Sequence, residues 1–249
     1  MRRSLPALPA LVALVALAIV AAACGGDDDS AVTPTSGPTS TSRTTPTAPA
    51  PACPDDPAPG ARTSRSEAEA DVDGDGEQDT VSSHLVDDQV WHLRVALAAG
   101  GGADVALGVL ASESVAVLGG GDADGDGAEE IWASTGSGAS ATIIGLARFD
   151  DCSLTQVTFD AGTPAEFPIG GSVGTASGLE CTGGAQEDDP DLTAYTVTNT
   201  GEDRYDLEAI GYVLDGDVLT RGDTSAASIS NRDPLFLRAT GFSCGSLTF

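Results

Sequence analysis

The chain has 249 residues, of which 38 are acidic and 11 are basic, and its formal net charge is −27. So large a negative charge excludes nucleic acid as a partner and direct adsorption to anionic lipid, since both depend on basic patches. It fits a protein that binds cations, and the chain is long enough for a domain with a real core.

The N-terminal region predicts an export signal followed by a lipid anchor. Arg2 and Arg3 precede an apolar segment over 5–20, and small residues then lead to Cys24. This is the layout of a cleavable signal peptide over 1–23, which is too short for a membrane-spanning helix. The ending "VAAAC" resembles the lipobox of bacterial lipoproteins, which implies acylation of Cys24 and anchoring to the outer face of the cell membrane. The alternative is an ordinary signal peptide with a chance cysteine.

The segment 24–61 is rich in Thr, Ser, Pro and Gly and contains almost no large apolar residue. Such a segment cannot bury enough surface to offset the entropy of ordering it, so we expect a disordered linker. It would hold a folded domain over 62–249 away from the membrane.

Four cysteines remain once Cys24 is assigned to the lipid: Cys53, Cys152, Cys181 and Cys244. An even number in an exported chain predicts two disulfides, for which three connectivities exist. We favour Cys53–Cys152 with Cys181–Cys244.

The sequence of the domain predicts an all-β fold of short antiparallel strands. Short runs of Val, Leu, Ile and Thr are separated by Gly and Asp, and several runs alternate with period two. In "WHLRVALA", for example, Trp91, Leu93 and Val95 share one face, whereas His92 and Arg94 share the other. A helical turn is expected only over 64–70. The expected strands are 80–86, 91–98, 103–110, 114–118, 131–135, 141–149, 154–159, 192–199, 205–214, 218–221 and 235–242.

Two acidic segments of the domain share one pattern. "ADVDGDGEQDTV" (70–81) and "GDADGDGAEEIW" (121–132) match at an offset of 51 positions, and a predicted strand follows each of them. The match defines repeats over 71–121 and 122–182. A degenerate third repeat spans 183–249, in which Asp191 holds the last acidic position.

The spacing of the acids predicts two structural Ca²⁺ sites. Carboxylates at positions one, three, five and nine of a tight loop supply the oxygen ligands that Ca²⁺ requires. A glycine at position six permits the sharp turn, and position seven offers its backbone carbonyl. Acidic turns without a metal are the alternative, since Asp-Gly is a common turn pair. The predicted ligands are Asp71, Asp73, Asp75, Glu77 and Asp79 in the first loop, and Asp122, Asp124, Asp126, Ala128 and Glu130 in the second.

The two loops are not EF-hands, because position twelve is Ser82 in one and Ala133 in the other. The pattern D-x-D-x-D-G-x-x-[DE] before a strand resembles the FG-GAP or VCBS-type repeat instead. The resemblance implies the blade-like sheets of integrin-like β-propellers, with a Ca²⁺ loop in each blade. Two good copies and a degenerate one imply an incomplete or small propeller-like fold.

No residue is predicted to be catalytic. "GGSVG" (170–174) matches the G-x-S-x-G of hydrolases, but no helix is expected after it. His84 and His92 are expected on strand surfaces rather than as metal ligands, because no cysteine or third histidine joins them.

The sequence therefore predicts a non-catalytic, membrane-anchored Ca²⁺-binding module that binds or organises partners at the cell surface. Its partner would be a glycan or a protein of the cell envelope. One alternative is a carbohydrate- or cell-wall-binding accessory protein, which exposed aromatic residues in a groove would support. The other is a hydrolase, which needs a pocket that gathers a histidine and acids away from the Ca²⁺ loops.

Overall fold

The computed structural model describes residues 53–54, 62–87, 89–110, 114–184 and 189–249, all within one compact unit spanning Pro49–Phe249. The predicted signal peptide, Cys24 and most of the predicted linker lie outside the described residues. No helix in the described part of the chain has the length and apolar character needed to cross a membrane.

The described residues fold almost entirely into β-strands, so the predicted all-β class is confirmed. Blade 1 consists of β1 (Arg62–Ala70), β2 (Asp79–Val86), β3 (Val90–Ala96) and β4 (Gly102–Leu110). Blade 2 consists of β5 (Ala116–Gly121), β6 (Glu130–Ser137), β7 (Ala141–Asp150) and β8 (Ser153–Gln156). Blade 3 consists of β11 (Thr175–Cys181), β12 (Leu192–Gly201), β13 (Arg204–Asp215) and β14 (Val218–Ser230). The other elements are β9 (Thr158–Phe159), β10 (Glu166–Gly171), α1 (Pro234–Arg238), β15 (Phe242–Cys244) and β16 (Leu247–Thr248).

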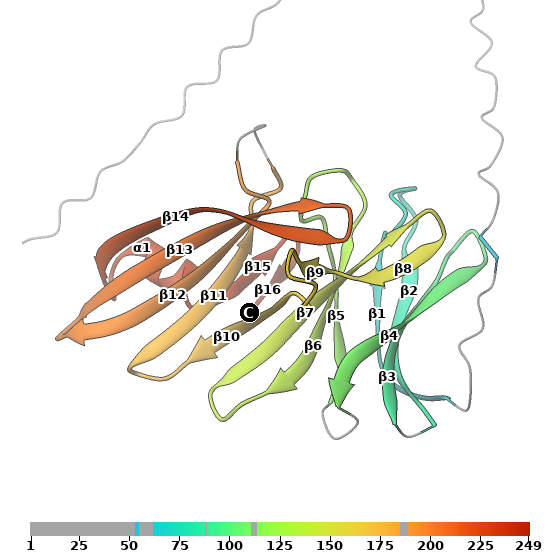
Figure 1. The fold of residues 1–249 in the computed structure, drawn as a ribbon, viewed down its shortest axis with the longest axis horizontal. Coiled ribbons are helices and arrows are strands. Elements are labelled where there is room, and N and C mark those ends of the chain that lie inside the picture. Colours follow the sequence, from blue (N-terminus) through green and yellow to red (C-terminus); the bar gives the residue numbers. More distant parts are fainter. Residues whose placement is uncertain (1–52, 55–61, 88, 111–113, 185–188) are drawn as a thin grey trace, which may run out of the picture. The chain divides into compact units, whose positions relative to one another are not determined.

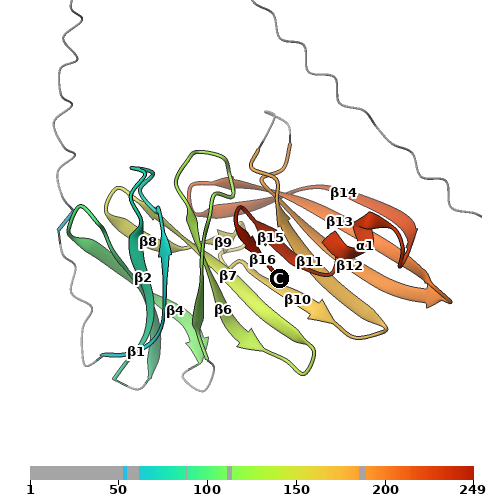
Figure 2. The ribbon, with the colours of Figure 1, turned by 180° about the vertical axis from the view of Figure 1, so that it is seen from behind.

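Each blade is an antiparallel meander in which successive strands pair with one another (Figure 1). Blade 1 forms a four-stranded sheet, whereas β10 pairs with both β7 and β11 and so joins blades 2 and 3 into a 12-stranded sheet. β15 pairs in parallel with β11, and Figure 2 shows the two strands from behind, near α1. Among the described strands no pairing closes a ring, so the blades are propeller-like without forming a closed propeller.

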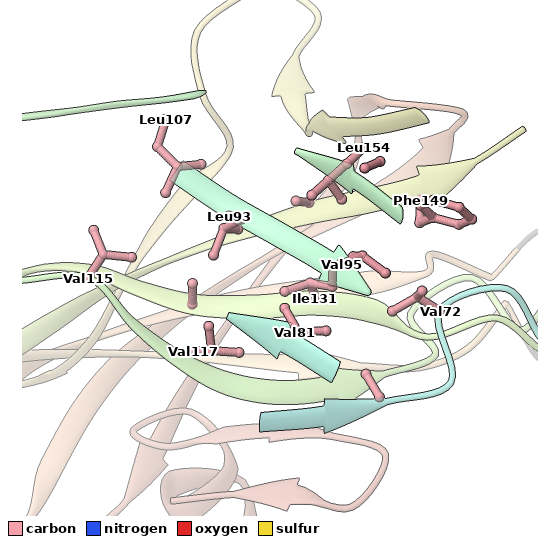
Figure 3. Close-up of a cluster of buried hydrophobic side chains, with 14 of the residues drawn as sticks. Val72, Val81, Leu93, Val95, Leu107, Val115, Val117, Ile131, Phe149 and Leu154 are labelled. Atoms are coloured by element: carbon pink, nitrogen blue, oxygen red, sulfur yellow. The ribbon is translucent and has the colours of Figure 1, made fainter. Parts of the chain in front are cut away.

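The alternation of apolar residues gives blades 1 and 2 a shared core (Figure 3). Val81 of β2, Leu93 of β3 and Ile131 of β6 are at most 2 % exposed in this core. Ile131 faces it, whereas the next residue, Trp132, is buried in a second core shared by blades 2 and 3. Blade 2 therefore lies between two apolar cores, and each large side chain buried there contributes roughly 1.5–3 kcal/mol.

Two disulfides join distant parts of the chain, with the pairing that the sequence favoured. Cys53–Cys152 links the segment before blade 1 to the turn between β7 and β8, and the Cα–Cα distance is 5.4 Å. Cys181–Cys244 links the end of β11 to β15. The bonds close loops of 99 and 63 residues, and a loop of this length restricts the unfolded chain by on the order of 4 kcal/mol.

The helical turn expected over 64–70 is wrong, because this segment is part of β1. Glu67 and Glu69 are exposed, Ala68 is half-buried and Ala70 is fully buried, which is a period-two pattern. The residues pair with β2, and these ladder hydrogen bonds outweigh the helix propensity of a short Glu- and Ala-containing segment.

The strand expected over 235–242 is also wrong, because the segment begins as the helix α1. The side chain of Asp233 accepts a hydrogen bond from the Leu235 N–H, and Pro234 occupies the first turn. An aspartate N-cap followed by proline is a helix-start signal that the strand prediction overlooked. Only Phe242, at the end of the segment, belongs to a strand.

Candidate metal centres

The two acidic segments occupy equivalent places in blades 1 and 2. Loop 1 (71–79) connects β1 to β2, and loop 2 (122–130) connects β5 to β6. Each loop ends on a register pair of its hairpin, Ala70 with Asp79 in blade 1 and Gly121 with Glu130 in blade 2. Both loops therefore join the first two strands of a four-stranded blade.

The two loops also share one internal hydrogen-bond pattern. The carboxylate at position one accepts from the N–H at position six, over 2.9 Å in loop 1 and 3.2 Å in loop 2. The carboxylate at position three accepts from the N–H at position five at 3.2 Å in both loops. The carboxylate at position five accepts from the N–H at position seven at 2.7 Å in loop 1 and 2.9 Å in loop 2. The carboxylate at position nine accepts from the N–H at position two at 3.1 Å in loop 1 and 2.8 Å in loop 2. Equal patterns from matched residues make the two loops copies of one structure.

Glycines at positions four and six allow this tight winding. Gly74 and Gly76 have φ of 68° and 89°, and Gly125 and Gly127 have φ of 80° and 98°. Any other residue is strained in this left-handed region. The winding turns the carboxylates of each loop toward one centre.

Three of the predicted ligand carboxylates converge in each loop. Their oxygens lie within 4.8 Å of one another, which is close enough for one cation to bind all three. The two groups are Asp71, Asp73 and Asp79 in loop 1, and Asp122, Asp124 and Glu130 in loop 2.

Positions five and seven stand apart from these groups. Asp75 and Asp126 at position five accept hydrogen bonds from the N–H groups of Glu77 and Ala128 at position seven. A ligand role for Asp75 and Asp126, and for the backbone carbonyls of Glu77 and Ala128, stays a prediction.

The position-nine carboxylates are buried, which opposes their ionisation. Asp79 and Glu130 are each 1 % exposed. Burial raises the pKa of Asp79, while the N–H groups of Ala98 and Val72 lower it. Burial raises the pKa of Glu130, the Ala123 N–H opposes this shift and the charge of Asp124 adds to it, and the resulting pKa is about 8. A bound cation would favour the ionised form of both groups.

Loop 1 contains a buried oxygen that lacks a partner. Asp71 Oδ1 has no hydrogen-bond donor among the described residues, although Oδ2 of the same carboxylate accepts from Gly76. No basic side chain in the described part of the chain forms an ion pair with loop 1. The orphaned oxygen and the all-oxygen donor set both fit a hard cation.

Loop 2 differs because Arg148 of β7 supplies a positive charge. Its Nη1 lies 2.6 Å from Asp124 Oδ2, and its Nη2 lies 2.6 Å from Asp126 Oδ2. Nη1 is also 3.8 Å from Glu130 Oε1. Burial lowers the pKa of Arg148, but the hydrogen bond and charge of Asp124 raise it on balance. The guanidinium therefore neutralises the carboxylates that a bound metal would otherwise neutralise.

Sequence reasoning missed Arg148, although the offset of 51 positions contained a signal. The residue that matches Arg148 in blade 1 is Leu97, which is buried in the core. A basic residue in only one of two otherwise matched repeats marks the place where the loops differ.

The loops are stacked against one another along the blades. In loop 1, the Asp71 N–H donates to Glu129 Oε2 at 2.9 Å, and the Asp71 carbonyl accepts from the Glu129 N–H at 2.8 Å. A Cβ on Gly125 of loop 2 would lie 2.4 Å from the carbonyl oxygen of Gly183 in loop 3 (182–191). Position four is therefore glycine for a second reason, because the next loop packs against it.

Loop 3 retains the buried acid of the other loops. Asp191 is 7 % exposed and accepts from the Leu214 N–H at 2.7 Å, as Asp79 accepts from the Ala98 N–H at 2.8 Å. The donor occupies the same place in both blades. It lies two residues after the residue that pairs with the first strand residue following the acid. This shared geometry supports the kinship of loop 3, of which residues 185–188 lie outside the described part.

The described residues form neither a nucleophile elbow nor an exposed tryptophan platform. Ser172 of "GGSVG" lies in the turn between β10 and β11, a strand–turn–strand hairpin rather than the strand–turn–helix of a nucleophile elbow. Trp91 and Trp132 are buried, as expected of core residues, and do not form an exposed aromatic platform. The expectation that His84 and His92 lie on a strand surface is wrong, since they are 3 % and 8 % exposed.

Comparison of the chain with protein-family models, with curated proteins and with solved structures gave no match.

Proposed function

We propose that this protein is an exported, lipid-anchored and non-catalytic module that binds structural Ca²⁺ through its acidic loops. The proposal rests above all on Asp71, whose buried Oδ1 lacks a donor among the described residues while two further carboxylates face the same centre. Ca²⁺ at loop 1 would satisfy that oxygen and offset the repulsion among the acids. It would also hold β1 to β2, because the loop connects these strands.

A second Ca²⁺ at loop 2 would compete with Arg148. The donor set fits the ion equally well, since the matched carboxylates converge in the same way. Binding there requires the guanidinium to leave Asp124 and Asp126, so we expect weaker affinity than at loop 1. The FG-GAP or VCBS resemblance is supported by the position of both loops between the first two strands of a blade.

Thermal unfolding of the full chain, in Ca²⁺ and in a chelator, tests this proposal. Ca²⁺ at 100 times its Kd should stabilise the protein by about 2.7 kcal/mol, which raises the melting temperature. Asp71→Asn should remove most of this rise, whereas Asp215→Asn at an exposed position should leave it unchanged. Equal melting temperatures with and without Ca²⁺ would refute the proposal.

The anchor and the surface role need separate experiments, because they rest on the sequence alone. Cys24→Ala should move the protein from the membrane fraction to the soluble fraction. The two disulfides are consistent with an oxidising compartment outside the cytoplasm. Capture of cell-envelope glycan or protein by the full chain, compared with and without Ca²⁺, would identify a partner.

A further inference from the structure

Blade 1 contains a second kind of polar cluster, on the sheet face opposite its core. His84 of β2 and His92 of β3 are register partners, and their rings stack with centroids 5.5 Å apart. Asp104 of β4 lies on the same face, two residues from the register partner of His92. These are both histidines of the chain.

The three side chains are buried and in contact. His92 Nδ1 lies 2.5 Å from Asp104 Oδ1, and His84 Nε2 lies 3.2 Å from Asp104 Oδ2. The Asp104 side chain is 5 % exposed. Its Oδ2 has no hydrogen-bond donor among the described residues, because the 3.2 Å contact lacks hydrogen-bond geometry. A buried carboxylate oxygen in this state requires a cation or a donor.

We propose that His84, His92 and Asp104 bind a zinc ion. Two imidazole nitrogens and one carboxylate oxygen form a recurring zinc ligand set, in which water takes the fourth position. Two ligands at about 2.05 Å from a tetrahedral ion lie about 3.3 Å apart. The 3.2 Å pair already has this spacing, and the 2.5 Å pair needs to separate by less than about 1 Å.

The zinc site is chemically distinct from the Ca²⁺ loops. The loops offer only oxygen ligands, which suit Ca²⁺, whereas imidazole nitrogens suit zinc. Arg94 is the register partner of Asp104, and a positive charge at that position weakens metal binding. A bound zinc would link β2, β3 and β4 across the sheet, and thus fasten blade 1 independently of loop 1.

The test uses the full chain, prepared without a polyhistidine tag and kept in excess Ca²⁺ to saturate the oxygen sites. Because the chain contains 2 histidines, proton NMR resolves the imidazoles of this cluster alone. Zn²⁺ should bind with a stoichiometry of one by calorimetry and shift both imidazoles together. Co²⁺ should give the visible ligand-field bands of a tetrahedral nitrogen-containing site.

Variants then assign the ligands. Asp104→Asn and His84→Gln should each weaken Zn²⁺ binding by at least about 100-fold, since loss of a ligand exceeds the effect of losing a neighbour of a ligand. Asp71→Asn and Asp215→Asn should bind Zn²⁺ as the unmodified protein does. Imidazole signals that do not respond to excess Zn²⁺ would overturn the proposal, and this readout needs no variant to fold. Unchanged Zn²⁺ affinity in folded His84→Gln would overturn it as well.

Discussion

Loop 1 and loop 2 have the same backbone but balance their charge in different ways. In loop 1, a buried oxygen of Asp71 lacks a donor and no basic side chain forms an ion pair with the carboxylates, among the described residues. In loop 2, the matching oxygen of Asp122 accepts from the Gly125 N–H at 2.7 Å, and Arg148 binds two carboxylates. The same loop structure thus receives a positive charge from the chain in loop 2 and none from the described residues in loop 1, where our proposal assigns a cation from solution.

Loop 3 represents a third arrangement, in which the acids at positions one and three are absent. Gly183 and Ala185 occupy these positions in the sequence, and Asp191 keeps its place at position nine. The hydrogen bond from the Leu214 N–H persists without the two missing acids. The acid at position nine therefore holds the strand hairpin even where the acids at positions one and three are absent.

Removal of the positive charge of Arg148 should have the largest effect on the free energy of unfolding. Arg148→Gln leaves Asp124 and Asp126 without their partner, so without Ca²⁺ the free energy of unfolding should fall by about 3 kcal/mol. With Ca²⁺ much of this loss should be recovered, because the ion then binds loop 2 unopposed. Denaturant unfolding and Ca²⁺ calorimetry measure the two effects, and Arg204→Gln on an exposed hairpin is the control. A variant that is destabilised yet binds no additional Ca²⁺ would break the equivalence of the loops.

Two glycine substitutions in loop 2 should distinguish the cost of backbone strain from the cost of contact with loop 3. Gly125→Ala combines a φ of 80° with a Cβ 2.4 Å from the Gly183 carbonyl oxygen, and should cost about 2–3 kcal/mol. Gly127→Ala has a φ of 98° but open space around the Cβ, and should cost only about 1 kcal/mol. Chemical denaturation of both variants measures the difference. Equal losses would show that contact between loops 2 and 3 contributes little.

The pH dependence at loop 3 should be the smallest effect. Burial raises the pKa of Asp191 and the charge of Asp124 adds to the shift, although the Leu214 N–H opposes it. The contribution of this group to stability is therefore full below the unfolded pKa near 3.8 and is lost as the pH rises through the folded pKa. Asp191→Asn keeps an oxygen acceptor for Leu214 but cannot ionise, so its unfolding free energy should depend less on pH between 4 and 7. Parallel curves for the variant and the unmodified protein, followed by circular dichroism, would contradict this.

Features that are local in sequence were predictable. Alternation identified most strands, and β2 begins within one residue of its expected start at position 80. The acidic loops were predictable because the spacing of the acids and the glycines that permit positive φ both lie within a few consecutive residues. Two disulfides were predictable from the even number of cysteines, whereas the observed pairing was only the favoured one of three connectivities.

Features that depend on register between strands were not predictable. Arg148 reaches loop 2 because β7 pairs with β6, and Asp104 reaches the histidines because β4 pairs with β3. No local pattern reports those pairings, so the histidines were placed on a surface. β10 and β11 were missed for a related reason, since glycines interrupt the runs over 166–181 that the pairing with β7 and β12 holds in place.

The disulfide Cys53–Cys152 determines how the domain responds to force. β1 is an edge strand that pairs only with β2, and its hydrogen bonds would open one after another if the preceding chain were pulled. Tension applied before Cys53 passes instead through the sulfur atoms to Cys152, which adjoins β7 in the middle of the domain. The disulfide closes a covalent loop of 99 residues, which contains blade 1 and both acidic loops. Tension between the N-terminal segment and the C-terminal part of the chain therefore bypasses this loop. A protein tethered by its N-terminal end would thus keep its two acidic loops free of mechanical strain.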